Sequence, residues 1–138
     1  MRFARWAFGI AGALGILEIA PLYFMEAQLA VQMPPALTHP EFYYGFAGVT
    51  LAWQLAFLVI GSDPQRYRPL MPVAVLEKAS FVVAAYWLWT QGRLPSMLIG
   101  GALLDLLYGI GFVVAYFTTR PRQPSTMSAM TRFPKTVG

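Results

Sequence analysis

The stretch SMLIGGALLDLLYGIGFVVAYF, residues 96–117, decides the fold class of this chain. Its 22 residues include one charged side chain, Asp105, in a run that is otherwise apolar or weakly polar. A helix needs about 20 apolar residues to cross the ~30 Å hydrocarbon core of a bilayer. The stretch therefore predicts a transmembrane helix that carries an acid near its middle.

Three more segments of similar length and character precede it, at residues 4–24, 42–61 and 70–90. Only helices and closed barrels satisfy the backbone in lipid, and these segments lack the two-residue alternation of barrel strands. We therefore predict an all-α integral membrane protein, a four-helix antiparallel bundle over residues 1–117. Residues 118–138 are predicted to form a basic, proline-containing tail.

Composition supports a membrane protein of one domain. Of the 138 residues, 57% are hydrophobic and 12% are charged, with a mean hydropathy of +0.53. A typical soluble domain has about 25% charged residues. The chain cannot supply the polar surface that a soluble protein of this size needs.

The basic residues at the ends of the apolar segments predict an orientation. On one side lie Arg2, Arg5, Arg66, Arg68, Arg120, Arg122, Arg132 and Lys135. On the other side lies Arg93, together with Glu26 and Glu41. By the positive-inside rule both termini are cytoplasmic, in the inner membrane if the source is bacterial. The net charge of +4 follows from this placement and does not indicate a nucleic-acid partner.

The first segment follows Arg2 and Arg5, as the apolar part of a signal peptide would. Glu18 and Pro21 interrupt it, and no clean cleavage site follows, so we expect a retained span. The tail is expected to be disordered. The alternative is contact with lipid headgroups or a partner, because basic residues near an anionic leaflet each contribute about 1 kcal/mol.

The chain lacks the residues that several classes of catalytic chemistry need. The chain has no cysteine, one histidine (His39, in a predicted loop) and six carboxylates. Thiolate metal sites and cysteine nucleophiles are therefore excluded. We expect no metal site and no cofactor, and we favour a protein that is not an enzyme.

Four ionisable residues fall within the apolar segments: Glu18, Glu77, Lys78 and Asp105. Each costs about 2.5–3.5 kcal/mol at mid-helix, and such residues usually face the bundle interior and mark function. Lys78 is predicted to pair with Asp105, directly or through Gln54 or water, and not with Glu77, because adjacent helical residues do not face each other. Together the four would carry a charge of −2. At least one of Glu18 and Glu77 is therefore expected to be protonated or exposed to water.

Small residues predict which helix faces pack. Gly101, Asp105 and Gly109 are spaced four apart on one face, and glycines there let another backbone approach closely. Gly15 and Glu18 share a similar small-residue stripe. We predict that Gly15, Gly101 and Gly109 are packing positions and that Glu18 faces the bundle interior.

A ligand pocket is a further candidate. Pro21 frees the carbonyl of Leu17, which then needs a polar partner near Glu18. Trp53 and Tyr108 lie deeper than the aromatic residues expected at the interfaces, and Gln54 lies at the level of Lys78. Glu18, Trp53, Gln54 and Tyr108 are therefore candidate ligand-binding residues.

Three stretches, IAPLYFMEAQLAVQMPP (19–35), WQLAFL (53–58) and RYRPLMPVAVL (66–76), resemble the EXPERA family of four-helix membrane proteins related to emopamil-binding protein. The resemblance implies a lipophilic-ligand pocket in which Glu26 is a pocket acid. It does not extend to isomerase activity, because Thr50 or a neighbour stands where a second acid is expected and His39 lies in a loop. The small bacterial DoxX-like proteins are similar in architecture.

Three interpretations of function follow. The first is a non-catalytic subunit or assembly partner of a larger membrane complex. The second is a protein that binds a lipid or another lipophilic molecule, and the third moves protons or a cation through Glu18, Asp105 and Glu77. Membrane lipid and other membrane-protein subunits are the expected partners.

Overall fold

The computed structural model of the chain describes residues 2–33 and 38–120, and all regular elements within these ranges are helical. In chain order they are α1 (Arg2–Ile19), η1 (Ala20–Phe24), α2 (Glu26–Gln32), α3 (Pro40–Ser62), η2 (Arg68–Leu70), α4 (Met71–Thr90) and α5 (Met97–Thr118). The predicted tail beyond Arg120 lies outside the described residues.

Four helical stretches are long and apolar enough to cross a membrane: Arg2–Phe24, Pro40–Ser62, Arg68–Thr90 and Met97–Thr118. They match the predicted segments to within two residues at each end. The prediction of four apolar helices is confirmed. The length and composition of these helices are those of an integral membrane protein.

The first span is not a single α-helix. The α-helix ends at Ile19, and a 3₁₀ helix with Pro21 in its first turn continues to Phe24. Proline lacks the N–H that an α-helix needs, so the break falls where the ring enters the chain. The short helix α2, which begins at Glu26, was not predicted, because its seven residues carry no clear periodic signal.

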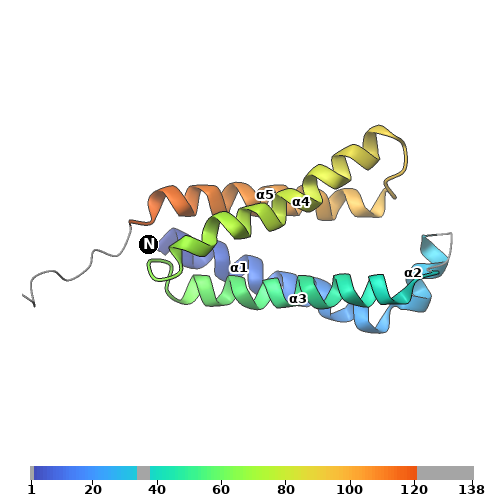
Figure 1. The fold of residues 1–138 in the computed structure, drawn as a ribbon, viewed down its shortest axis with the longest axis horizontal. Helices are drawn as coiled ribbons and strands as arrows, with labels where there is room; N and C mark the ends of the chain where they lie inside the picture. The colour runs from blue at the N-terminus through green and yellow to red at the C-terminus, as the bar shows by residue number, and fades with distance from the viewer. Residues whose placement is uncertain (1, 34–37, 121–138) are drawn as a thin grey trace, which may run out of the picture.

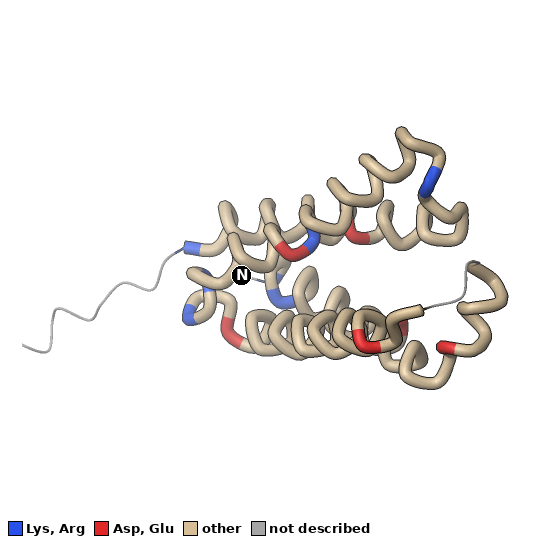
Figure 2. Tube along the Cα trace, turned by 45° about the vertical axis from the view of Figure 1, so that its right-hand side comes forward, with Lys and Arg blue, Asp and Glu red and all other residues tan. Residues whose placement is uncertain are grey.

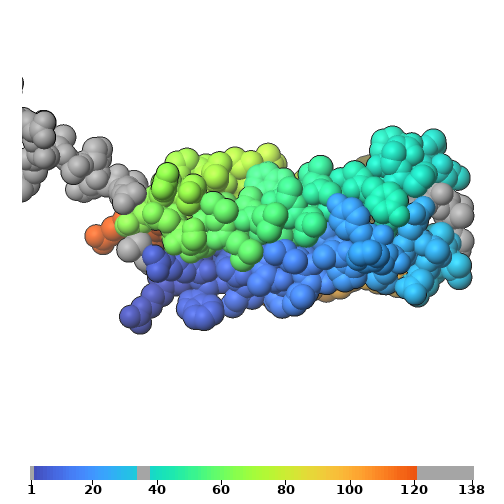
Figure 3. Space-filling view, turned by 90° about the horizontal axis from the view of Figure 1, so that it is seen from below, coloured from blue at the N-terminus to red at the C-terminus, as the bar shows by residue number. Residues whose placement is uncertain are grey.

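The helices form two antiparallel pairs, α1 with α3 and α4 with α5 (Figure 1). The α1–α3 pair presents one continuous face along its length (Figure 3). The two pairs meet mainly through α1 and α5, whereas α3 and α4 touch little. The start of α1 and the end of α5 lie at the same end of the bundle (Figure 1).

The hydrophobic core lies in the half of the bundle near this end. It comprises buried residues of all four long helices: Ala4, Phe8, Ala11, Phe57, Ile60, Met71, Ala74, Phe112 and Ala115. At its centre the rings of Phe8 and Phe112 stack with centroids 4.0 Å apart, and Phe57 meets Phe112 edge-on at 4.9 Å. This cluster joins the two pairs at one end and leaves the other half less tightly packed.

Most of the described arginines lie at the same end of the bundle (Figure 2), which we call the arginine end after Arg2, Arg5, Arg66, Arg68 and Arg120. Arg68 ties two elements together there. Its Nε donates a hydrogen bond of 2.8 Å to the Thr119 carbonyl, and its guanidinium lies 4.0 Å from the centre of the Tyr116 ring. The α3–α4 connection thereby caps the end of α5.

Helices α1 and α3 pack closely because α1 carries glycines at the contact. A β-carbon at Gly12 would lie 2.7 Å from the Gln54 carbonyl oxygen, and one at Gly15 would overlap the Gln54 side chain. The backbones could not approach this closely with larger side chains.

Candidate functional site

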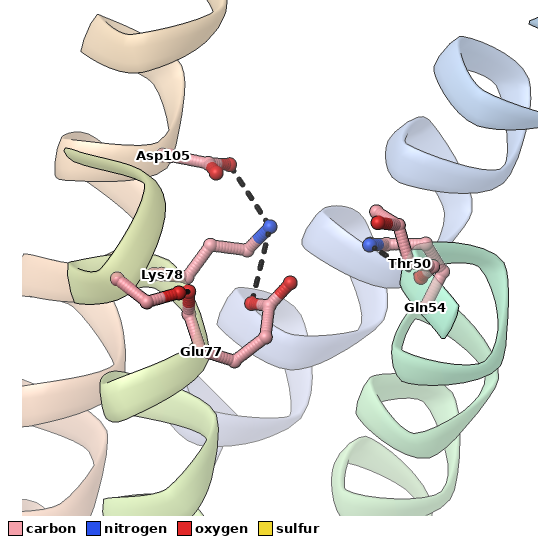
Figure 4. Close-up of polar contacts among 6 residues, drawn as sticks. Thr50, Gln54, Glu77, Lys78 and Asp105 are labelled. Atoms are coloured by element: carbon pink, nitrogen blue, oxygen red, sulfur yellow. Dashed lines mark hydrogen bonds and ion pairs between the residues drawn. The ribbon is translucent and has the colours of Figure 1, made fainter. Parts of the chain in front are cut away.

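The candidate site is a cluster of three ionisable side chains on α4 and α5, which we call the Lys78 cluster: Lys78, Glu77 and Asp105 (Figure 4). The Lys78 ammonium donates a hydrogen bond of 2.9 Å to Asp105 Oδ1, and its Nζ lies 3.4 Å from Glu77 Oε2. The structure thus brings Lys78 and Asp105 together directly, without a bridge from Gln54.

The contact between Lys78 and Glu77 contradicts the expectation from helix geometry. Adjacent residues leave a helix in different directions, but both of these side chains are long and curl toward the same point (Figure 4). The rule holds for the direction of the β-carbons and fails for the charged ends of long side chains.

The cluster lies in the middle of the membrane-spanning region. Glu77 and Lys78 are close to the centre of the span Arg68–Thr90. The side chains of Lys78, Glu77 and Asp105 are 6%, 17% and 21% exposed. Buried ion pairs in hydrocarbon are costly unless well paired, so their presence marks a site worth explaining.

Aromatic rings complete the surroundings of the ammonium. Lys78 Nζ lies 5.3 Å from the centre of the Phe57 ring and 6.0 Å from that of Tyr108. A cation close to a ring face is attracted by the ring's electron density. Gly109 follows Asp105 by one turn, and a β-carbon there would lie 3.5 Å from Lys78 Cβ, so this glycine lies at the α4–α5 contact.

Gln54 is buried on α3 opposite the cluster, but its side chain is engaged elsewhere (Figure 4). Its amide nitrogen donates a hydrogen bond of 3.1 Å to the Thr50 carbonyl, and the side chain lies over Gly15. Gln54 therefore serves the α1–α3 contact in the structure and does not reach Lys78.

Glu18 does not face a closed interior, and this expectation was wrong. The small-residue stripe on α1 is buried at Ala11 and Gly15, but Glu18 is exposed. The core ends before this level, so the stripe emerges from between the helices. Trp53 and Tyr108, the aromatic candidates, are partly buried against the core.

Glu26 has a partner of its own near the opposite end of the bundle. The Tyr44 hydroxyl donates a hydrogen bond of 2.7 Å to Glu26 Oε2, and the Tyr43 hydroxyl donates to the Leu22 carbonyl. These contacts join η1 and the start of α2 to the start of α3. No contact joins Glu26 to Glu18 among the described residues.

Gly101 is not a packing position within one chain. It is exposed, and a β-carbon there would meet nothing within 4 Å. The packed positions of α5 are nearer its C-terminal end and include Gly109, Phe112 and Ala115.

A groove between α4 and α5, which the sequence did not suggest, runs past Asp105. The part of the groove beside Asp105 has a volume of about 300 Å³. Its lining includes Val75, Ala79 and Val83 of α4 and Asp105, Gly109 and Val113 of α5. A second hollow of about 370 Å³, lined in part by Pro72 and Tyr116, shares Val75 and Val113 with it. The two hollows are therefore adjacent along the α4–α5 contact, one at the level of Asp105 and the other toward the arginine end, and we call them together the α4–α5 groove.

The described residues contain no group of three or more histidine, cysteine or acidic side chains that could hold a metal ion. The side chains of the Lys78 cluster contact one another, and the groove is the space beside them that is open to a ligand. No family model, curated protein or solved structure matches the chain.

Proposed function

We propose that this protein binds a membrane lipid, with one acyl chain held in the α4–α5 groove. The observation that carries the proposal is that the two hollows of the groove are adjacent along α4 and α5, because they share Val75 and Val113. An acyl chain enters a bilayer from the surface and extends toward its middle. A groove that runs from the arginine end to the middle of the span has the same direction.

The lining favours hydrocarbon. Apart from Asp105, the residues that line the part of the groove beside it are aliphatic or glycine. Its volume lies at the lower end of the ~300–1,000 Å³ typical of ligand pockets, and with the second hollow it extends lengthwise. It therefore suits part of one flexible chain better than a broad rigid molecule.

The end of the groove favours an anionic headgroup. Tyr116 lines the second hollow, the one toward the arginine end. The Arg68 guanidinium is stacked on the Tyr116 ring. Arginine presents several donors in a plane that matches phosphate oxygens. A lipid phosphate at this level would also meet the general positive charge of the arginine end.

This proposal includes an orientation. With the arginine end in the cytoplasm, as the positive-inside rule predicts, the lipid would come from the cytoplasmic leaflet. That leaflet carries the anionic lipids in most cells. The headgroup preference and the membrane orientation both follow from the same arginines.

Native mass spectrometry of the delipidated protein tests the proposal. The probes are phosphatidylglycerol and phosphatidylcholine with the same acyl chains. Ala79→Leu fills the groove, and Ala84→Leu makes the same change on α4 at an exposed residue that does not line it. We expect one tightly held phosphatidylglycerol, bound about tenfold more weakly by Ala79→Leu, which corresponds to ~1.4 kcal/mol, and unchanged in Ala84→Leu.

Equal weakening by both variants, or none by either, would contradict the groove as the site. Equal binding of the two lipids would contradict the anionic headgroup. The role of an accessory subunit stays a prediction. A protein that co-purifies with the wild type and is lost in Ala79→Leu would replace lipid by a partner helix as the occupant.

A further inference from the structure

One ammonium faces two carboxyl groups in the Lys78 cluster. The titratable groups around it are Glu77 and Lys78 of α4 and Asp105 and Tyr108 of α5. The acid of α1, Glu18, is exposed. The facing side chain of α3, Gln54, is neutral. If both carboxyl groups of the cluster were ionised, it would carry a net charge of −1 in the middle of a span.

The two carboxyl groups are not equivalent. Asp105 accepts a hydrogen bond of 2.9 Å from Lys78. Glu77 Oε2 lies 3.4 Å from the same nitrogen, is fully buried and has no hydrogen-bond partner in the structure. An ionised oxygen without a hydrogen bond is the costliest arrangement for a buried carboxyl group, and a neutral carboxylic acid costs far less.

We infer that Glu77 is a proton-binding site. It holds one proton at neutral pH, so that the cluster is neutral as a whole: a Lys78 ammonium, an Asp105 carboxylate and a Glu77 carboxylic acid. Lys78 is already within 3.4 Å of Glu77. The proton can therefore be held by either acid, with the ammonium bonded to whichever acid is ionised.

This inference goes beyond lipid binding and does not depend on it. It does have a consequence for the groove, because Asp105 belongs to both the cluster and the groove lining. When the proton is on Asp105, Lys78 bonds to Glu77, and a neutral acid faces the groove. When the proton is on Glu77, the acid that lines the groove is an Asp105 carboxylate whose charge is balanced by Lys78.

Infrared spectroscopy of the protein in phosphatidylcholine vesicles at neutral pH tests the inference. The neutral carboxyl stretch is separate from that of a carboxylate, and the amide band of the same spectrum reports whether each variant keeps its helices. Subtracting the spectrum of Glu77→Gln from that of the wild type removes the signals of the other acids. We expect this difference to contain one neutral carboxyl per chain.

Charge balance gives two further expectations. In Asp105→Asn the only remaining counter-charge for Lys78 is Glu77, so Glu77 ionises and its neutral band disappears. In Lys78→Met neither acid has a counter-charge, so roughly two neutral carboxyl groups per chain are expected. Glu77→Gln imitates the protonated acid in shape, and this variant keeps the test valid if the other two lose their helices.

Either of two results would overturn the inference. One is a wild-type spectrum that loses no neutral carboxyl band in Glu77→Gln. The other is a Glu77 band that persists in a helical Asp105→Asn variant, because the proton would then not follow the charge balance around Lys78.

Discussion

The carbonyl oxygen of Gln54 on α3 lies so close to Gly12 on α1 that an added β-carbon would be 2.7 Å from it. Two side-chain atoms of Leu58 would lie 2.9 Å from the same β-carbon. The backbone of α3 cannot move away without opening the whole α1–α3 contact. At Gly12 an added side chain would meet the backbone of α3, whereas at Gly15 it would meet the Gln54 side chain, which can change its rotamer.

We expect Gly12→Ala to lower the free energy of unfolding by about 1–3 kcal/mol, the usual cost of overpacking. Gly9→Ala is the matched control, because a β-carbon there meets nothing within 4 Å and alanine favours helices by up to ~1 kcal/mol. Denaturant unfolding in detergent micelles measures both. Equal stability of the two variants would contradict the close contact.

Asp105→Ala should lower stability by about 1.5–3 kcal/mol, because it removes the 2.9 Å hydrogen bond of the Lys78 ammonium and leaves the more distant Glu77 as its counter-charge. Combining it with Lys78→Met removes the ammonium that has lost this hydrogen bond. The double variant should therefore be more stable than the sum of the single effects predicts, by an amount within the ~0.5–3 kcal/mol seen for contacting pairs. Strict additivity in denaturant unfolding would show that the two residues do not interact.

Glu77→Gln should cost much less than Asp105→Ala, about 1 kcal/mol or below, since Glu77 Oε2 accepts no hydrogen bond that the change could remove. The same unfolding measurement compares them. A larger loss in Glu77→Gln than in Asp105→Ala would mean that Glu77, and not Asp105, is the principal partner of Lys78.

Arg68→Lys should lower stability by about 1–2 kcal/mol. Lysine cannot reproduce both the stacking on Tyr116 and the hydrogen bond to the Thr119 carbonyl. Arg93→Lys, at an exposed position whose partner Gln91 is also exposed, should change little. Thermal unfolding distinguishes them. A similar small effect of both changes would mean that the cap on α5 contributes nothing.

The absence of cysteine from the chain makes its orientation testable with single thiols. Ser96 lies in the α4–α5 connection, and Ser62 is the last residue of α3 at the opposite end of the bundle; both are exposed. In sealed cells an impermeant maleimide should label Ser96→Cys fully and Ser62→Cys only after the membrane is opened. The reverse pattern would put the arginine end outside and refute cytoplasmic termini.

The four spans could be predicted from the sequence because each depends on the length of one apolar run. The pairing of Lys78 with Asp105 could also be anticipated, since the depth of each residue follows from its position along its helix. Both inferences use one coordinate, the distance along the membrane normal, and a sequence encodes that coordinate directly.

Features that depend on how helices lean and rotate could not be anticipated. Glu18 continues a small-residue stripe, yet it is exposed because the core ends before its level. Gly101 shares its spacing with Gly109, but it is exposed and a β-carbon there would meet nothing within 4 Å. The groove arises from the packing of α4 against α5, so no local pattern reveals it.

Photo-crosslinking tests the lipid in the groove most directly. The probe is a phosphatidylglycerol with a diazirine near the end of one acyl chain, bound to the purified protein and analysed by peptide mapping. We predict that the crosslinks fall on residues 75–83 of α4 and 105–114 of α5, and that Ala79→Leu removes them while Ala84→Leu does not. Crosslinks spread evenly over exposed apolar residues of other helices, such as Leu17 and Phe42, would contradict a lipid site in the groove.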